Sequence, residues 1–419
     1  MKKIIALSAV ASALFFAGCY DSSSTSNANM PEFAKKSAVI ESPKDVTKGL
    51  IFIDKNILIN NGGFIEYPFS INNFSVSNAN PKKLNFILEN IQYYNEYLFD
   101  RAIDTNCEYF KFQNEESCEN GGKLIEIDEI KSKDGKCIVT QTIKSEQCKM
   151  RERDENISLN GSQLFNISFL INENGEILDN NKINVNYVMN YAADSISEDD
   201  KWDMVNKMNV RLDYSFIDKR MVGLESRIVG SFKLDYFENN VKQISYDFNS
   251  NINSIAKAEN NAFVIGLNGW AKRKNYRLRE NGEERVNYSG IAAENFKVEY
   301  SRPYEDERIN KITVSGKIGT LCTKGMMSFT TKQPIILRDD EFDRLPVSGK
   351  LEVKGTNKAD VEFVNDRNLT IKANGETKYY EDWYDVKSDA RRNCEIEDMR
   401  WIFNEDVRDM WRFIYEILD

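Results

Sequence analysis

The residue types that could support catalysis are few. The chain of 419 residues contains no histidine, which excludes serine–histidine and cysteine–histidine pairs, histidine-ligated zinc and histidine pH switches. Two adjacent carboxylate pairs, Asp199-Asp200 and Asp339-Asp340, lie in polar stretches. Glycosidase chemistry needs two carboxyl groups that converge across a cleft, so we expect these pairs to be solvated charges. No phosphate-binding glycine motif occurs. We therefore expect neither an enzyme nor a metal or cofactor site.

One basic cluster stands out from an acidic chain. With 56 Lys and Arg against 66 Asp and Glu, the formal net charge is −10, which argues against nucleic acid as a partner. Five basic residues nevertheless gather near Trp270 and Tyr276: Lys272, Arg273, Lys274, Arg277 and Arg279. They form a candidate patch for an anionic sugar or a lipid headgroup. The favoured alternative is an exposed hairpin whose charges are balanced by Glu280, Glu283 and Glu284.

A cysteine near the N-terminus has the context for covalent attachment of lipid. Lys2 and Lys3 precede an apolar run, Ile4 to Ala17, that is shorter than the ~20 residues of a membrane span but suits a secretion signal. The run ends in Ala17-Gly18-Cys19, two small residues followed by a thiol. This pattern resembles the lipobox of bacterial lipoproteins, with Phe16 where Leu is commonest. The resemblance implies a signal peptide over residues 1–18 and diacylglyceryl and acyl chains such as palmitate on Cys19.

The residues that follow predict a spacer between the lipid and the domain. Residues 20–29 are almost all Ser, Thr, Asn and Asp, and we expect residues 19–47 to form a flexible tether. The residue after Cys19 is Tyr20, not the Asp that marks inner-membrane retention in many such lipoproteins. The resemblance therefore favours the outer membrane of a bacterial cell envelope, with the surface and periplasmic leaflets both open.

Six further cysteines, an even number in an exported chain, predict three disulfides. They are Cys107, Cys118, Cys137, Cys148, Cys322 and Cys394. The absence of both histidine and any C-x-x-C motif argues against a metal or redox site. We expect the two distant cysteines, Cys322 and Cys394, to pair with each other.

Hairpin register narrows the pairing of the other four cysteines. If Asp134-Gly135 is a two-residue turn, facing positions sum to 269, and Cys118 with Cys148 sums to 266, which is close to opposition once a bulge or a frayed end is allowed. Cys107 would then pair with Cys137 by elimination. The rival scheme, which joins sequence neighbours, stays open. That scheme pairs Cys137 with Cys148. If the residues after Cys137 run straight as a strand, they carry Cys148 more than ~20 Å away from Cys137.

The body of the chain shows period-2 alternation from about Lys48 onward. In residues 183–187, Ile183, Val185 and Tyr187 alternate with two Asn residues, and Asn-Gly or Asp-Gly turns separate such runs. This pattern predicts a mainly β domain over residues 48–419. We expect a large curved antiparallel sheet, either an open half-barrel or sandwich-like, because helical crossovers are lacking. In residues 124–130 the alternation sets Leu124, Glu126 and Asp128 on one face against Ile125, Ile127 and Ile130 on the other.

Few segments predict helices. An apolar stripe with 3–4 spacing over residues 395–418 predicts a C-terminal amphipathic helix packed on the sheet. A shorter helix is predicted from Ser197 to Met208, because Ser197 and Asp200 resemble a capping box. Residues 84–99 fit either a helix or a strand.

Two asparagines lie in a pattern similar to the acidic-x-Asn-x-Ser/Thr acceptor of bacterial N-glycosylation. They are Asn156, in residues 154–158, and Asn368, in residues 366–370. We treat both as candidate glycosylation sites, which would place these loops on the accessible surface.

In plan, the chain resembles lipoproteins built on an open half-barrel, which include lipoprotein carriers and surface adhesins of the jejuni-lipoprotein type. The likeness rests on the lipobox, the Ser/Asn spacer and the long alternating strands. It implies a surface lipoprotein that binds or adheres to a host or envelope protein, a glycan or a lipid, with the membrane as partner through its anchor. Two alternatives stay open: a periplasm-facing lipid or lipoprotein carrier that uses the concave face, and a structural envelope component.

Overall fold

The computed structural model describes residues 30–53, 96–152, 155–196, 200–218, 220–259, 262–279, 281–301, 309–339, 344–364 and 368–391. The helical elements are η2 (Glu32–Lys35), α2 (Pro43–Ile53), α4 (Glu96–Asp104) and α5 (Trp383–Arg391). The strands are β1 (Phe110–Ser117), β2 (Lys123–Lys133), β3 (Lys136–Glu152), β4 (Glu155–Leu170), β5 (Lys182–Ile196), β6 (Asp200–Ile217), β7 (Arg220–Glu238), β8 (Val241–Glu259), β9 (Ala262–Leu278), β10 (Glu284–Ser301), β11 (Ile309–Thr320), β12 (Gly325–Asp339), β13 (Arg344–Lys354), β14 (Lys358–Val364), β15 (Asn368–Ala373) and β16 (Glu376–Tyr380).

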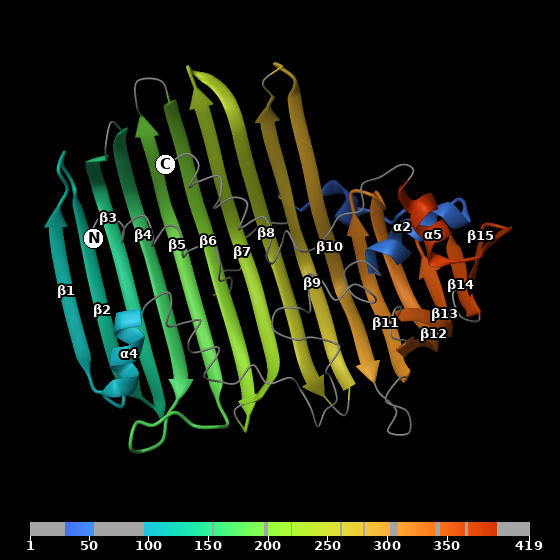
Figure 1. Cartoon of the computed structure of the whole chain (residues 1–419), viewed down its shortest axis with the longest axis horizontal. Coiled ribbons are helices and arrows are strands. Elements are labelled where there is room, and N and C mark those ends of the chain that lie inside the picture. The colour runs from blue at the N-terminus through green and yellow to red at the C-terminus, as the bar shows by residue number, and fades with distance from the viewer. Residues whose placement is uncertain are drawn as a thin grey trace. The chain divides into compact units, whose positions relative to one another are not determined.

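These strands form one sheet in which hydrogen-bonded neighbours follow the order of the chain from β1 to β16 (Figure 1). The pairs with a defined register, such as β2 with β3 and β13 with β14, are antiparallel. Among the described strands, β1 and β16 each have a neighbour on one side only, so the sheet is open. The predicted mainly β, antiparallel fold is confirmed.

Two of the predicted Asx-Gly turns close tight hairpins. Lys133 faces Lys136 across Asp134-Gly135, and Ala373 faces Glu376 across Asn374-Gly375. Asp134 and Gly135 have φ of 52° and 69°, and Asn374 and Gly375 have φ of 49° and 80°. Two consecutive positive φ angles give the turn that matches the twist of antiparallel strands, and only Asn, Asp and Gly adopt them at low cost.

Backbone contacts divide the described chain into two units. The first comprises residues 96–251 and 272–288, and the second comprises residues 30–53, 252–271 and 289–391. In the first unit, Tyr187 of β5 faces Val210 of β6, which faces Ile228 of β7, and all three side chains are buried. The inward and outward alternation predicted for residues 183–187 is confirmed, because Asn184 and Asn186 occupy the other face.

The helix predicted from Ser197 to Met208 is wrong. Residues 200–208 belong to β6, and residues 197–199 lie outside the described residues. Every residue of β6 up to Met208 is paired with β7, and most are also paired with β5. A strand hydrogen-bonded on both sides satisfies its backbone fully, and this tertiary pairing overrides the local capping signal.

The prediction of which side chains of β2 share a face is also wrong in part. Ile130 (0% exposed) pairs with the inward Val139 of β3, so the even-numbered residues of β2 share the buried face of the unit. Asp128 lies on this face at 6% exposure, opposite Gln141. Ile125, on the other face, is 9% exposed, so both faces of β2 are covered. Alternation alone therefore indicated the burial of Ile125 correctly but missed that Asp128 and Ile130 are buried together on the opposite face.

The second unit begins earlier in the chain than predicted. Within the expected tether of residues 19–47, residues 30–47 are packed and not free: Phe33, Ala38, Ile40 and Val46 are buried. Phe33 lies in a core cluster with Trp270, Ala292 and Met326. The domain therefore includes residues that the tether was expected to contain, and residues 19–29 lie outside the described part.

Three helices complete the described structure. α2 packs on α5 and on β15 in the second unit, and α4 packs on β2 and β3 in the first. In α5 the carboxylate of Asp389 accepts hydrogen bonds from Lys378 and from the hydroxyl of Tyr380 (3.1 Å), which join the helix to β16. Residues 84–99 fitted either a helix or a strand, and residues 96–99 of this segment belong to helix α4. The helix predicted at 395–418 lies outside the described residues, and no described helix has the length and apolarity of a membrane span.

Candidate functional site

Two disulfides of the first unit match the pairing favoured from the sequence. Cys107 bonds to Cys137 and Cys118 bonds to Cys148, with Cα–Cα distances of 5.7 and 5.4 Å. Both bonds end on β3, and Cys107, Cys137 and Cys148 are buried. They attach the segment after α4 and the β1–β2 connection to one central strand.

The near-opposition of Cys118 and Cys148 has a cause that the register argument did not contain. Cys118 follows β1 and lies in the β1–β2 turn, not in the β2–β3 hairpin. Backbone hydrogen bonds attach that turn to β3. Asn120 donates to the carbonyl of Lys149 (2.9 Å), and Lys149 donates to the carbonyl of Gly121 (2.8 Å). A bulge between Ser145 and Cys148 brings the second cysteine to this turn.

The remaining predicted modification sites are only partly described. Cys322 is 7% exposed in the β11–β12 turn, whereas Cys394 and Cys19 lie outside the described residues. Asn156 is exposed near the start of β4, and Asn368 is half-buried at the start of β15. The Cys322–Cys394 bond, the lipidation and the two glycosylations stay predictions.

The predicted basic cluster lies on β9 and on the turn that follows it. Because successive side chains of a strand point to opposite faces, Lys272 and Lys274 occupy one face while Arg273 and Arg277 occupy the other. Arg273 is half-buried near Tyr246 of β8, whose pKa rises to about 12 because of its burial, with the positive charge of Arg273 opposing the rise. The five residues therefore do not form a single patch.

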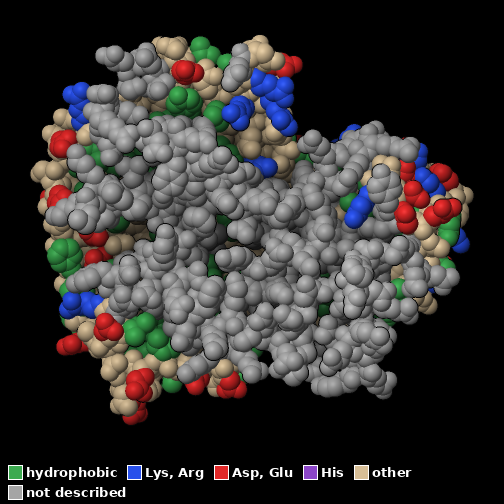
Figure 2. Space-filling model, in the orientation of Figure 1, with side chains coloured by type: hydrophobic (Ala, Val, Ile, Leu, Met, Phe, Trp, Pro, Cys, Tyr) green, Lys and Arg blue, Asp and Glu red, His purple; other side chains and the backbone are tan. Residues whose placement is uncertain are grey.

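The outer part of the β9–β10 hairpin is a second arrangement of basic and aromatic residues. Residues 284–288 of β10 are all exposed, as are Lys274, Arg277 and Arg279 on the β9 side. Figure 2 shows Lys and Arg side chains gathered over this hairpin, at the top of the view. Residues 272–288 hold six basic and three acidic residues, a net charge of +3 in a chain of net charge −10.

Contacts within the hairpin balance only some of this charge. Arg279 pairs with Glu283 (3.1 Å), and the hydroxyl of Tyr276 donates to Glu284 (3.3 Å). The ammonium of Lys274 lies 5.7 Å from the ring centre of Tyr288, which is 60% exposed. Arg277 makes no ion pair with the described residues. The expected charge balance therefore holds for Arg279, while Lys274 with the exposed ring of Tyr288 lies on one face of the hairpin and Arg277 lies on the other.

The carboxylate pairs singled out from the sequence do not converge in the described residues. Asp200 opens β6 opposite Glu238 and Asp339 ends β12 opposite Arg344, while Asp199 and Asp340 lie outside the described part. Within that part, no cluster of three or more Asp, Glu or Cys side chains could hold a metal ion.

Sequence reasoning missed a carboxylate that is buried in the first unit. Burial raises the pKa of Asp128 to about 6, and the negative charge of Glu126 adds to the shift. Glu126 shares the inward face of β2 and accepts a hydrogen bond from Gln141 (3.0 Å). The hydroxyl of Tyr187 donates to Gln163 nearby on the same face (3.1 Å). The alternation within β2 alone suggests that Asp128 and Glu126 face solvent. Only the register of β2 against β3 shows that they lie on the buried face.

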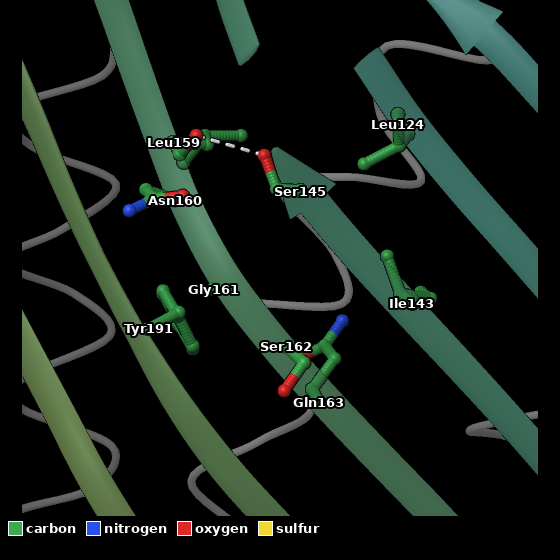
Figure 3. A pocket seen from close by; sticks show the side chains of 9 residues that line it. All are labelled: Leu124, Ile143, Ser145, Leu159, Asn160, Gly161, Ser162, Gln163 and Tyr191. Atoms are coloured by element: carbon green, nitrogen blue, oxygen red, sulfur yellow. Dashed lines mark hydrogen bonds between the residues drawn. The ribbon is translucent and has the colours of Figure 1, made fainter. Parts of the chain in front are cut away.

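A small cavity opens on the inward face of the same unit (Figure 3). Leu124, Ile143 and Leu159 line one part of it, and Gln163 and Tyr191 another. Its volume is about 40 Å³. Because one water needs about 10–15 Å³ by this measure, it has room for a few water molecules. Small-molecule sites are usually several hundred Å³, so this cavity is too small for an acyl chain.

Comparison with known proteins returns no match: no family model, no curated protein and no solved structure is significantly similar to this chain.

Proposed function

We propose that the chain is a lipoprotein of the bacterial outer membrane, anchored through Cys19, that serves as a non-enzymatic binding or adhesion protein at the cell surface. The observation that carries this proposal is the order of the N-terminal residues: Lys2-Lys3, the apolar run to Ala17, and Ala17-Gly18-Cys19. Each part has a role in export and lipidation, and together they are far more specific than any one alone.

The disulfides of the first unit support export. Disulfides such as Cys107–Cys137 and Cys118–Cys148 persist in oxidising compartments and are rare in the cytosol. An envelope location provides such a compartment. The two bonds also stabilise a domain that faces an unprotected environment.

The hairpin formed by β9 and β10 is the best candidate for the contact surface. It is exposed and carries net positive charge in an acidic protein, and the exposed Arg277 and Arg285 share one of its faces, opposite Lys274 and Tyr288. Arginine binds carboxylate and sulfate oxygens through paired donors. An anionic glycan fits this chemistry.

The anchor and the exposure are tested on whole cells. Labelling with radioactive palmitate should mark the wild-type chain and not Cys19→Ala. Protease added to intact cells should remove the wild-type domain from the surface. A chain that carries no lipid refutes the anchor, and a lipidated chain that is protected in intact cells but cleaved after lysis refutes surface exposure.

The binding surface is tested on arrays of sulfated, sialylated and neutral glycans. Arg277→Gln/Arg285→Gln should lose at least about a hundredfold in affinity for anionic glycans, since each charged hydrogen bond contributes about 1.5–3 kcal/mol and about 1.4 kcal/mol is a factor of ten. Lys111→Gln/Lys207→Gln makes the same charge change at exposed positions of β1 and β6 and should bind as wild type. Equal losses in both variants, or no anionic preference in the wild type, would contradict the assignment.

A further inference from the structure

The segment after the predicted anchor is fixed to one end of the second unit. We call residues 36–41 the strap. Ala38 donates to the carbonyl of Met326 (2.9 Å), and Met326 donates to that of Lys36 (2.8 Å), beside the β11–β12 turn. Thr356 in the β13–β14 turn donates to the carbonyl of Ala38 (2.8 Å), and Asn357 donates to that of Ile40 (2.9 Å). The strap therefore crosses successive hairpin turns at one end of the strands.

Close packing leaves the strap no room to shift. A Cβ on Gly325 would lie 2.5 Å from the backbone of Ser37 and Ala38, and a Cβ on Gly355 would overlap the carbonyl oxygen of Ala38. Ala38 and Ile40 are fully buried. Just before the strap, Phe33 is buried with Trp270 and Met326. The point at which the chain enters the second unit is thus fixed by both core packing and hydrogen bonds.

The length of chain between the anchor and this point limits how far the unit can stand from the membrane. Ten residues lie between Cys19 and Met30, which makes eleven Cα–Cα steps. Even a fully extended chain spans at most ~3.6 Å per residue, so the reach is roughly 40 Å. Met30, which packs against the core cluster of Phe33, is therefore tied within that distance of the lipid to which Cys19 would be attached, and the strap begins six residues later.

The surface at the strap end combines positive charge with exposed apolar side chains. Lys36 and Lys324 are exposed, and neither makes an ion pair with the described residues. Val39 is 55% exposed and Leu321 is 40% exposed. Glu32, before the strap, pairs with Lys35 (2.6 Å), and the exposed Glu41 lies at the opposite end of the strap, where Asn374 of the β15–β16 turn donates to its carbonyl (3.4 Å).

We propose that these four residues, Lys36, Val39, Leu321 and Lys324, form a membrane-contact surface that rests on the anionic headgroups of the bilayer holding the Cys19 lipid. The proposal depends on the lipid anchor proposed above. Lysines near a membrane are attracted to anionic headgroups, and exposed apolar side chains beside them enter the interface. The anchor raises the local concentration of this surface at the bilayer, so weak contacts suffice to hold the second unit against it.

The test uses the lipidated full chain in nanodiscs, either of phosphatidylcholine alone or with about 30% phosphatidylglycerol. Acylation of lysines by a water-soluble reagent is followed by mass spectrometry. Lys36 and Lys324 should react about fivefold more slowly in the anionic discs, and about 0.5 M NaCl should abolish the difference. Lys311 is the matched control, because it is exposed near the other end of β11 and should react equally in both discs.

A second measurement is independent of lysine chemistry. Amide exchange of the β11–β12 turn should slow in anionic discs for the wild type, and for Lys311→Glu, but not for Lys36→Glu/Lys324→Glu. Equal rates at Lys36 and Lys324 in both discs, with no slowing of the turn, overturn the membrane contact. The mass of the N-terminal peptide from the same sample reports the lipid on Cys19. A lipid-free peptide refutes the anchor itself, whereas a lipidated peptide with unchanged rates refutes only the contact surface.

Discussion

Replacing Phe33 by alanine tests whether the strap end is fixed by core packing. The exposed fraction of Phe33 is 5%, and its ring packs with Trp270, Ala292 and Met326. A Cβ on Gly290 would lie 3.0 Å from this ring, which shows how closely the neighbouring strand approaches. Phe33→Ala leaves all strap hydrogen bonds in place and removes only the apolar contacts before them.

The expected cost follows from the size of the lost side chain. Truncation of a buried Phe to Ala costs about 3–5 kcal/mol, and we take the lower end, about 3 kcal/mol, because a short N-terminal segment can relax into part of the cavity. Two units need not unfold in one step, so a local measurement suits the question better than a global melt. Amide exchange at Ala38, whose N–H is bonded to Met326, should accelerate by roughly a hundredfold.

Val39→Ala is the control, because Val39 lies in the same strap but is 55% exposed. Its effect on Ala38 exchange should stay within about threefold, since exposed substitutions change stability by less than about 0.5 kcal/mol. If Phe33→Ala accelerates Ala38 exchange no more than Val39→Ala does, hydrogen bonds alone hold the strap and the packing explanation is wrong.

Two further predictions concern the first unit. The pKa of Asp128 is about 6 in the folded chain, above the unfolded value near 4, so the folded state binds the proton more tightly and stability falls as pH rises from about 4 to 6. Asp128→Asn should therefore raise the urea midpoint at about pH 7.5 more than at about pH 4, and an equal effect at both would contradict the shift. Gly161 has a φ of +129°, and a Cβ there would overlap the carbonyl oxygen of Asn190. Gly161→Ala should lower the free energy of unfolding by about 1–3 kcal/mol, measured by thermal or urea unfolding. Gly135→Ala is the control and should cost clearly less, because φ there is +69° but no atom lies within 4 Å of the added carbon. Equal costs would show that the close approach at Gly161 does not contribute.

Local signals in the sequence predicted the strands and their tight turns. Asp134-Gly135 and Asn374-Gly375 form two-residue hairpin loops because their positive φ angles are a property of those residue types. The Cys118–Cys148 pairing was also predicted with a bulge allowed, and a bulge is present, although Cys118 lies in the β1–β2 turn and not in the β2–β3 hairpin from which the register was counted.

The sequence pattern gave wrong predictions where the conformation or burial of a residue depends on a neighbouring strand. Residues 200–208 carry a helix-like start, yet pairing with β5 and β7 makes them part of a strand. Asp128 looked solvent-facing, yet the register with β3 turns it inward. In the basic cluster, adjacency along the chain suggested one patch, and the pleat of β9 divided it between two faces.

The sequence by itself predicted an export and anchoring signal, and it determined an antiparallel β domain and its tight turns, because each depends on residues close together in the chain. Only the tertiary structure decided that residues 30–47 belong to the domain. Their fixed conformation depends on partners more than 300 positions away: Asn357 donates to Ile40, and the N–H of Ile40 donates to Thr356. A short segment of mixed polar and apolar residues without periodicity gives no local sign of such contacts, since the hydrogen bonds and the cavity for Phe33 exist only after the distant strands have assembled.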